Sequence, residues 1–350
     1  MRRSRRLSER FGHGVIVGKF YPLHAGHSAL IRAALRRCDR VTVQLLASSV
    51  ESISLEMRAE WIRQEHPTVS LVTGMDDADV DFDSPTAWDE HMVVIEELLD
   101  APVDAVFTSD AYGAELATRL GAEWVQIDAG RVFNGVHGRS IRADLEANWS
   151  ELPVSVRESL VERIVFVGAE STGKTTLSAA VAEHYGVPWV PEYGRLYTEI
   201  REGGAFTEWR PDEFDIITDR QIVDEQAAAR RTPKPFVIGD TDVFATALWY
   251  ERYLEVENPA LMARAAEHWP LLYILAGDEI PWVDDGTRDG EHIRHAMHER
   301  FREELTKQPT PWLEVRGSVD ERVALSVAAI DEALAGAHDF AVPLELRQRS

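Results

Sequence analysis

Short apolar runs alternate with stretches of helical periodicity along the chain from Gly14 onward. In the first half, the runs predict strands at 15–20, 41–47, 69–73, 105–108 and 124–127. The periodic stretches between them predict helices at 28–37, 55–65, 88–99 and 112–120. A strand that is followed each time by a helix is typical of a parallel sheet covered by helices.

The pattern stops near Trp149 and starts again at 164, after a polar stretch with one proline. The second half predicts strands at 164–167, 236–238, 271–275 and 312–315, with helices at 175–185, 212–229, 243–254 and 321–334. We therefore expect two α/β domains, each with a parallel sheet flanked by helices. The expected division is a basic tail at 1–13, a first domain at 14–149, a linker at 150–162, a second domain at 163–340 and a tail at 341–350.

The composition is that of a folded globular chain, since 45% of the 350 residues are hydrophobic and 28% are charged. Lys and Arg number 37 against 60 Asp and Glu, and the net charge of -23 opposes binding to nucleic acid. No apolar run approaches the ~20 residues of a membrane span, so we expect no membrane partner. The only cysteine is Cys38, which permits no internal disulfide and favours a reducing, cytoplasmic location. The sequence leaves the oligomeric state open, a homo-oligomer included.

The segment from Gly168 to Thr175, GAESTGKT, fits the phosphate-loop pattern GxxxxGK[ST] between a predicted strand and a predicted helix. In such a loop, backbone N–H groups surround an anion, the lysine reaches the outer phosphates of ATP, and the hydroxyl holds Mg²⁺. We expect Lys174 to act in catalysis and Thr175 to bind the metal. The other residues expected to bind the nucleotide are Gly168, Glu170, Ser171, Thr172, Gly173 and Thr176.

Phosphoryl transfer also needs carboxylates beside the metal and the acceptor hydroxyl. Asp240 follows the predicted strand at 236–238 and is the candidate metal ligand, although acidic residues in such places also cap helices, as Asp242 is placed to do. Glu192 in VPEYGR is the candidate to orient or deprotonate the acceptor. The sequence leaves open whether Glu192 or Asp240 is the catalytic base.

Further candidates surround the acceptor and the transferring phosphate. Tyr193 and Arg195 are the expected substrate-binding residues, with a surface ion pair as the competing role of Arg195. The segment PWVDDGTRDG at 281–290 is typical of a lid, from which Arg288 and the following Arg294 would reach the phosphoryl group. Several aromatic residues near these motifs are candidates for stacking on a planar ring, and the sequence does not choose among them: Trp189, Tyr193, Trp209, Trp249 and Tyr250.

A second motif, GKFYPLHAGH from Gly18 to His27, also follows a strand and begins a helix. Imidazoles at the start of a helix can stabilise the charge that develops on an α-phosphate when pyrophosphate leaves, so His24 and His27 are candidate catalytic residues. A metal site is the alternative, but no third ligand lies nearby in the sequence. The residues expected to bind the nucleotide here are Gly18, Lys19, Phe20 and Gly26.

GKFYPLHAGH resembles the signature of the HxGH nucleotidyltransferases, and its pairing with GAESTGKT resembles the bifunctional nicotinamide mononucleotide (NMN) adenylyltransferase and ribosylnicotinamide kinase family. Further similarity lies in SLEMRAEWIRQEHP with Arg58 and Trp61, in VFTSDAYGAELATRLGA, in VPEYGR and in PWVDDGTR, so that it extends over nearly the whole chain. The resemblance implies a Rossmann-like nucleotidyltransferase domain at 14–149 and a P-loop kinase domain at 163–340.

The resemblance also implies two steps of NAD salvage that use ATP and Mg²⁺. The second domain would phosphorylate the 5′-hydroxyl of nicotinamide riboside, and the first would join the resulting NMN to AMP from ATP, giving NAD and pyrophosphate. The partners would be the small molecules nicotinamide riboside, NMN and ATP. Some members carry an N-terminal DNA-binding helix-turn-helix, for which the short segment before the first strand leaves no room.

One motif departs from the family. The ISxTxxR motif of the transferase domains corresponds to VHGRSIR at 136–142, where Arg142 is retained as a nucleotide-binding candidate but His137 and Arg139 replace the serine and threonine. Because two hydroxyl donors to the triphosphate are missing, we expect adenylyl transfer to be weakened or altered in substrate choice. The alternatives are a kinase whose first domain is a nucleotide-binding or regulatory module, a kinase for another nucleoside, and an ATP-dependent switch without catalysis.

Overall fold

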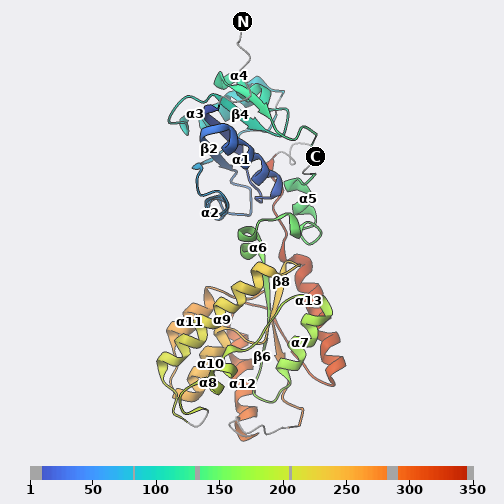
Figure 1. The fold of residues 1–350 in the computed structure, drawn as a ribbon. Coiled ribbons are helices and arrows are strands. Elements are labelled where there is room, and N and C mark those ends of the chain that lie inside the picture. The colour runs from blue at the N-terminus through green and yellow to red at the C-terminus, as the bar shows by residue number, and fades with distance from the viewer. Residues whose placement is uncertain (1–9, 82, 131–134, 205–206, 282–290, 345–350) are drawn as a thin grey trace. The chain divides into compact units, whose positions relative to one another are not determined.

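The computed structural model describes residues 10–81, 83–130, 135–204, 207–281 and 291–344. The chain divides into two compact units (Figure 1): unit 1 comprises Met1–Val156 and Asp339–Ser350, and unit 2 comprises Arg157–His338. Each unit is built on a five-stranded sheet whose neighbouring strands are parallel. The predicted fold class, two α/β domains with parallel sheets flanked by helices, is therefore confirmed. Among the residues described, no helix combines the length and apolarity that crossing a membrane requires.

The sheet of unit 1 has the strand order β3-β2-β1-β4-β5. Its strands are β1 (Phe11–Gly18), β2 (Cys38–Ala47), β3 (Ser70–Met75), β4 (Ala105–Thr108) and β5 (Glu123–Gln126). Its helices are α1 (Ala25–Arg37), α2 (Leu55–Glu65), α3 (Pro85–Glu97), α4 (Gly113–Leu120) and α5 (Gly138–Ala143). The strand order changes direction between β1 and β4, and ligands of such sheets bind beyond the carboxyl ends of the strands at this point.

Local sequence explains where the helices of unit 1 begin and how they pack. The hydroxyl of Ser54 accepts a hydrogen bond from the N–H of Met57 at 3.2 Å, which caps α2. Ser84 caps α3 in the same way, and Pro85 occupies the first turn, where its missing N–H costs nothing. Buried side chains of α3 and α4 then pack against Val15 and Val106 of the central strands.

The edges of unit 1 differ from the expected division of the chain. Strand β1 begins at Phe11, inside the expected tail 1–13, because Phe11 and His13 are buried and pair with β2. The expected linker at 150–162 contains helix α6 (Val154–Leu160), which spans the division between the units. Residues 341–344, expected in the tail at 341–350, belong to unit 1, and Pro343 is buried there.

The sheet of unit 2 has the order β10-β9-β6-β8-β7. Its strands are β6 (Glu162–Val167), β7 (Trp189–Val190), β8 (Phe236–Gly239), β9 (Leu272–Ala276) and β10 (Trp312–Val315). Its helices are α7 (Lys174–Tyr185), α8 (Tyr193–Ile200), α9 (Pro211–Arg231), α10 (Val243–Leu254), α11 (Pro259–Ala266), α12 (Glu291–Lys307) and α13 (Val319–Ala337).

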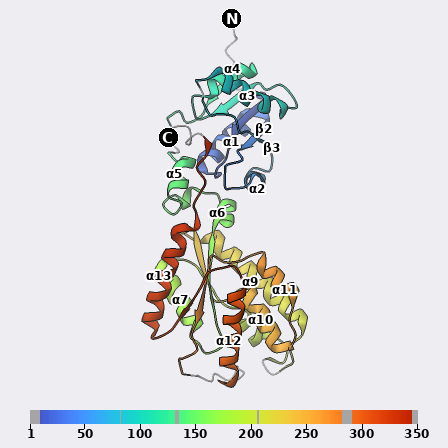
Figure 2. The same ribbon diagram turned by 180° about the vertical axis from the view of Figure 1, so that it is seen from behind.

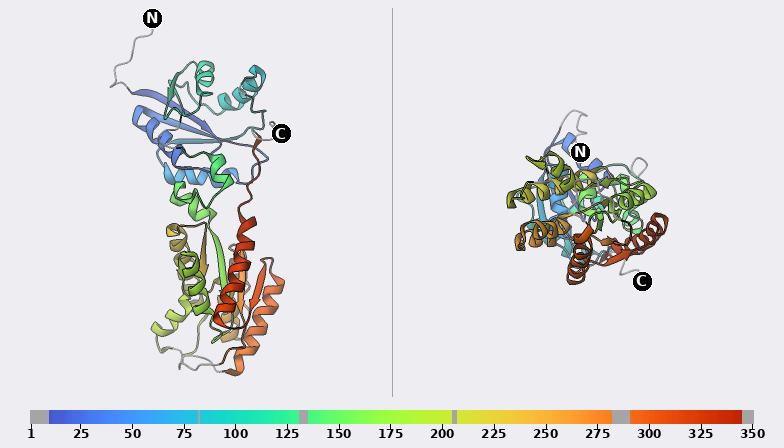
Figure 3. Two further views of the ribbon diagram at one scale, coloured as in Figure 1. Left: turned by 90° about the vertical axis from the view of Figure 1, so that its right-hand side faces the viewer. Right: turned by 90° about the horizontal axis from the view of Figure 1, so that it is seen from below.

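The alternating side chains of β6 build a core on each face of this sheet. Ile164 and Phe166 pack with α7 and α13, whereas Val165 and Val167 pack with α10 and α12. The two helical layers of unit 2 can be followed from behind in Figure 2 and from the side in Figure 3. A central strand that is apolar on both faces explains why 164–167 reads as a continuous apolar run.

A buried ion pair holds the segment between α8 and α9. The Arg201 guanidinium lies 2.8 Å from the Glu213 carboxylate, and neither side chain is more than 3% exposed. Arg201 also donates to the carbonyl of Glu208 at 2.9 Å and lies 4.0 Å from the ring centre of Trp209. This arginine therefore orders the backbone that carries Trp209.

We expect Arg201→Met to lower the free energy of unfolding by about 3 kcal/mol or more, because it leaves the Glu213 carboxylate buried without its partner. Equilibrium urea unfolding followed by tryptophan fluorescence measures this change. Arg264→Met is the matched control: Arg264 pairs with Asp219 on the surface, where the loss is under about 1 kcal/mol. Equal losses in the two variants would contradict the role given to Arg201.

Candidate active sites

The turn between β6 and α7 has the backbone of a phosphate loop. Gly168, Ser171 and Gly173 have φ values of 148°, 57° and 74°, in the region that L-residues rarely adopt. A side chain at Gly168 would meet the carbonyl oxygen of Ala276 at 3.1 Å, so glycine is required there. Thr172 closes the loop by donating from its hydroxyl to the carbonyl of Ala169 at 2.8 Å. The loop thus presents its backbone N–H groups at the N-terminus of α7.

The ammonium of Lys174 joins the two predicted carboxylates. Its Nζ lies 3.0 Å from Glu192 Oε2 and 3.1 Å from Asp240 Oδ1. Burial lowers the pKa of Lys174, but the charges of Asp240 and Glu192 outweigh it, so this pKa lies above its ordinary value. Burial raises the pKa of Asp240, whereas Lys174 and the Thr175 hydroxyl act to lower it. The structure therefore brings together Lys174, Thr175, Glu192 and Asp240, as the motifs predict.

Lys174, Thr175 and Glu192 border a cleft of about 510 Å³, whereas Asp240 lies buried behind Lys174 and outside its lining. One wall consists of predicted residues, which are Gly168, Glu170, Ser171, Thr172, Gly173, Lys174, Thr175, Thr176, Glu192 and Arg195. The rest of the lining includes the aromatic residues Trp209, Phe214, Trp249 and Tyr253. Trp209 and Tyr253 lie with ring centres 5.2 Å apart, and Tyr253 stacks on Trp249 at 6.1 Å. The cleft thus places an aromatic surface beside a phosphate loop.

Other candidates in unit 2 lie elsewhere. The ring of Tyr193 packs near Tyr197 and lies outside the lining of the cleft. Arg294 is buried and donates to the carbonyl of Ile280 at 2.6 Å, just before the segment expected to form a lid. Arg288 lies outside the described residues. Asp242 caps α10 by accepting from the N–H of Ala245 at 3.0 Å, as the alternative for this residue predicts.

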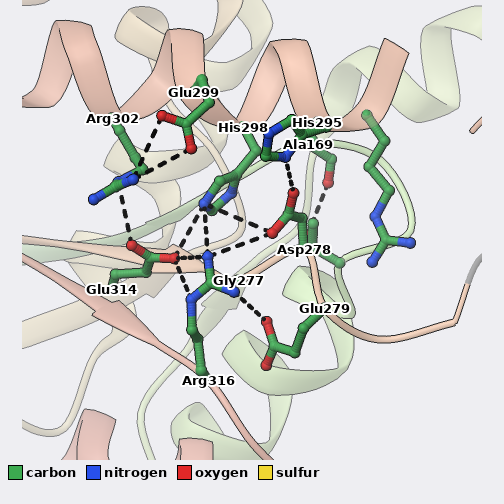
Figure 4. A network of polar contacts seen from close by, with 12 residues as sticks. Ala169, Gly277, Asp278, Glu279, His295, His298, Glu299, Arg302, Glu314 and Arg316 are labelled. Atoms are coloured by element: carbon green, nitrogen blue, oxygen red, sulfur yellow. Dashed lines mark hydrogen bonds and ion pairs between the residues drawn. The ribbon is translucent and has the colours of Figure 1, made fainter. Parts of the chain in front are cut away.

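A polar network fixes the end of β9 next to the phosphate loop (Figure 4). Arg316 contacts both Asp278 and Glu279 at 3.4 Å. Arg322 of α13 is buried and donates to the carbonyl of Thr172 at 2.8 Å and to Glu279 at 2.5 Å. The network continues through His295, His298, Glu299, Arg302 and Glu314. These contacts hold the phosphate loop against the residues that directly follow β9.

The turn between β1 and α1 forms the second site. Phe20 has a φ of 47°, which is strained for a bulky residue. His24 caps α1: its Nδ1 accepts from the N–H of Gly26 at 3.2 Å, so in the neutral ring Nε2 carries the proton and is a donor. The rings of His24 and His27 stack with centres 3.8 Å apart. Two imidazoles and a helix N-terminus are therefore gathered at the carboxyl end of β1.

A buried carboxylate positions the cation of this turn. The Glu51 side chain lies 3.3 Å from Lys19 Nζ and 2.7 Å from Arg58. Arg58 also donates to the carbonyl of Lys19 at 2.9 Å. Arg58, which lies on α2, therefore supports the β1–α1 turn and compensates the charge of Glu51.

The turn lines a cleft of about 1080 Å³. All the predicted residues of unit 1 lie on it, which are Gly18, Lys19, Phe20, Gly26, His24, His27 and Arg142, together with His137 and Arg139. Sequence reasoning missed Asp76, Trp88, His91, Asp110 and Asp128, which also line it. Three of these could have been found, because Asp76, Asp110 and Asp128 follow the carboxyl ends of β3, β4 and β5.

The motif VHGRSIR at 136–142, which differs from ISxTxxR, lies at the start of α5. His137 is the N-cap residue, and its N–H donates to the hydroxyl of Ser140 at 3.2 Å. His137 and Arg139 are exposed, whereas Arg142 donates to the carbonyl of Tyr21 and lies 4.7 Å from its ring centre. Within the described residues, no cluster of three or more His, Cys, Asp or Glu side chains is arranged to hold a metal.

Comparison with known proteins gives similarity over most of the chain. A family model described as an AAA domain matches residues 163–322, which contain the phosphate loop. The trifunctional NAD biosynthesis/regulator protein NadR of Escherichia coli K12 is 28% identical over 293 residues, which are 79% of this chain and 71% of that protein. The NadR protein of Salmonella typhimurium LT2 is 27% identical over 317 residues, or 84% of this chain and 76% of that protein.

Solved structures show the same fold. A crystal structure of a NadR protein in complex with NR aligns with a TM-score of 0.71 at 21% identity, covering 94% of this chain and 97% of that one. A NadR protein in complex with NAD and AMP-PNP aligns with a TM-score of 0.68 at 20% identity, covering 93% and 97%. By its sequence similarity to two NadR proteins and its fold similarity to two NadR crystal structures, this chain is NadR-like.

Proposed function

We propose that this protein makes NAD from nicotinamide riboside in two ATP-dependent steps, one in each unit. Unit 2 phosphorylates the 5′-hydroxyl of the riboside to give NMN. Unit 1 transfers the adenylyl group of a second ATP to NMN and releases pyrophosphate. The observation that carries the proposal is that each unit has a strained strand-to-helix turn with phosphate-binding chemistry on the wall of a cleft. The two NadR relatives are named as NAD biosynthesis/regulator proteins, which supports a role of this protein in NAD metabolism.

The kinase step follows from the groups around Lys174. The riboside hydroxyl oxygen attacks the γ-phosphorus of ATP, the bond to the ADP oxygen breaks, and the hydroxyl proton passes to a carboxylate. Glu192 fits the role of base better than Asp240, because its side chain is 25% exposed and lines the cleft, whereas Asp240 is only 2% exposed. Lys174, positioned by both carboxylates, stabilises charge on the transferring phosphate.

Thr175 and Asp240 fit a magnesium ion. The Thr175 hydroxyl acts to lower the pKa of the Asp240 carboxylate, and the two groups supply hard oxygen donors next to Lys174 of the phosphate loop. Bound Mg²⁺ would neutralise charge on the β- and γ-phosphates. Because burial raises the pKa of Asp240, a second cation near this carboxylate would favour its ionised form.

The aromatic lining supports nicotinamide riboside as the acceptor. The nicotinamide ring of the riboside is a planar cation, and aromatic faces attract such cations. Trp209, Trp249 and Tyr253 supply these faces, and Glu199 adds negative charge to the same cleft. An uncharged nucleoside would gain the stacking contacts without the electrostatic attraction.

Adenylyl transfer follows from the turn in unit 1. A phosphate oxygen of NMN attacks the α-phosphorus of ATP, and the bond to the leaving pyrophosphate breaks. His24, His27 and Lys19 line the cleft from one turn and donate to the phosphates. Arg142 reaches the same turn from α5.

A kinase with a regulatory first unit is the second candidate. Its support is the exposed pair His137 and Arg139, where the related motif has two hydroxyl donors. Under this reading NMN binds to unit 1 without release of pyrophosphate.

The two-site proposal predicts separable activities. Purified protein with ATP, Mg²⁺ and either nicotinamide riboside or NMN should give NAD from both substrates, as read by chromatography. Lys174→Ala should lower phosphorylation of the riboside by orders of magnitude and spare adenylyl transfer, because it removes only the ammonium of unit 2. His27→Ala should do the reverse.

Lys307→Ala is the matched control, since it removes an exposed lysine on α12. NMN that accumulates from the riboside, with NAD from neither substrate, would favour the second candidate. Faster phosphorylation of another nucleoside would overturn the choice of acceptor.

The aromatic lining makes a further prediction. Trp209→Ala and Tyr253→Ala should each raise KM for nicotinamide riboside about tenfold, because a stacked cation loses an aromatic face. KM for ATP should stay within about twofold, and Trp209→Phe should retain most of the affinity. Steady-state kinase assays measure both constants, and equal rises for riboside and ATP would place the aromatic residues outside the acceptor site.

The motif VHGRSIR at 136–142, which differs from ISxTxxR, predicts a substitution that increases adenylyl transfer. The double substitution His137→Ser with Arg139→Thr should raise kcat/KM for ATP in adenylyl transfer by about tenfold, because it supplies two hydroxyl donors for the triphosphate. Serine is also a good N-cap residue, so α5 is retained. The kinase rate of the same preparation is the internal control, and an unchanged transfer rate would show that His137 and Arg139 already serve in this role.

A further inference from the structure

The segment at 339–344 follows the last helix of unit 2 but belongs to unit 1. Both backbone groups of Ala341 are bonded there. Its N–H donates to the hydroxyl of Ser52 at 3.0 Å, and its carbonyl accepts from the hydroxyl of Tyr21 at 3.1 Å. The two hydroxyls are themselves 2.8 Å apart, and the ring of Phe340 meets the ring of Tyr21 edge-on at 6.3 Å. We call these contacts the C-terminal latch.

Tyr21 lies within the β1–α1 turn and is only 3% exposed. Its ring lies near two guanidiniums, that of Arg58 at 5.3 Å and that of Arg142 at 4.7 Å. Arg58 also binds the carbonyl of Lys19, and Arg142 that of Tyr21. The latch therefore adds a third support, from the far end of the sequence, to a turn already held from α2 and α5.

The turn needs such support because of its conformation. Phe20 has a φ of 47°, which persists only where surrounding contacts determine it. Lys19 and His24, on either side of Phe20 and Tyr21, must hold their donors within a fraction of an ångström of the phosphates to be effective. A displacement of Tyr21 would move both.

We propose that the C-terminal latch is a positioning element of the adenylyltransferase site, acting through Tyr21 on Lys19 and His24. This inference rests on the proposed function of unit 1. It makes the activity of the first unit depend on residues that lie after the kinase unit in the sequence. The latch touches no reacting atom, so its effect is on placement of the turn.

Substitutions in the full-length chain test the latch from both sides. Ala341→Pro removes the N–H that Ser52 accepts, and Ala341→Ser is its matched control because it keeps that N–H. Tyr21→Phe removes the hydroxyl and keeps the ring near Arg58 and Arg142. Val342→Ala is a second control, since this neighbouring side chain is 51% exposed.

Five quantities are measured for each variant: the KM for ATP and the kcat of adenylyl transfer to NMN, the kinase rate, the unfolding temperature, and hydrogen exchange of peptides covering 18–27. We expect Ala341→Pro and Tyr21→Phe each to lower transferase kcat/KM for ATP about fivefold or more and to speed exchange in 18–27. The kinase rate and both control variants should stay at the wild-type level. Because both changes break one latch, the double variant should lose little more than either single one.

The proposal is overturned if the unsubstituted protein transfers adenylyl groups to NMN and the Ala341→Pro and Tyr21→Phe variants do so at the same rate. Equal losses of both activities with a lowered unfolding temperature would also overturn it, since the latch would then serve only folding. If the parent protein makes no NAD from NMN, the proposed function of unit 1 fails. Hydrogen exchange still decides the latch in that case, because unchanged exchange in 18–27 overturns it and faster exchange supports it.

Discussion

Both sites depend on one backbone constraint, the sharp turn by which the chain leaves the carboxyl end of a central parallel strand and enters a helix. In unit 2, Gly168, Ser171 and Gly173 take positive φ values to make this turn, and in unit 1 Phe20 does. The turn directs backbone N–H groups and the helix N-terminus toward the edge of the sheet where ligands bind. The other functional groups are arranged around these two turns.

The two turns are held by different means. In unit 2 the supports are charged and largely buried: Lys174 with its two carboxylates, and Arg322 on the carbonyl of Thr172. Buried charges are costly unless they are paired, so each group has a narrow range of positions. In unit 1 a buried Arg58–Glu51 pair lies at the turn as well, but the contacts to its backbone come from arginines that bind carbonyls, and an aromatic ring, Tyr21, lies beside both arginines. A single buried ring joins segments that are distant in sequence.

Much of the fold could be predicted from the sequence, and the misses have physical causes. The helix at 55–65 and the strands at 105–108 and 312–315 have the predicted bounds. The buried residues of the helix recur on one face, and the strand at 105–108 is a continuous buried run. Strand β1 begins earlier than predicted because Gly12, His13 and Gly14 hide the apolar pattern. A side chain at Gly14 would meet the Cys38 sulfur at 2.5 Å, so this glycine reflects close strand packing. Helices α5 and α6 are short and largely polar, so their sequences carry little periodicity.

The sequence by itself determined the two strand-to-helix turns, because each is made by consecutive residues whose spacing and backbone freedom are local properties. Tertiary structure decided which remote residues join them. It placed Tyr253 and Phe214, rather than Tyr193, in the lining of the cleft of unit 2, joined Asp240 to Lys174, and brought Ala341 onto Tyr21. Such contacts depend on how helices and strands pack, and no short-range pattern records the packing of segments that lie far apart in the chain.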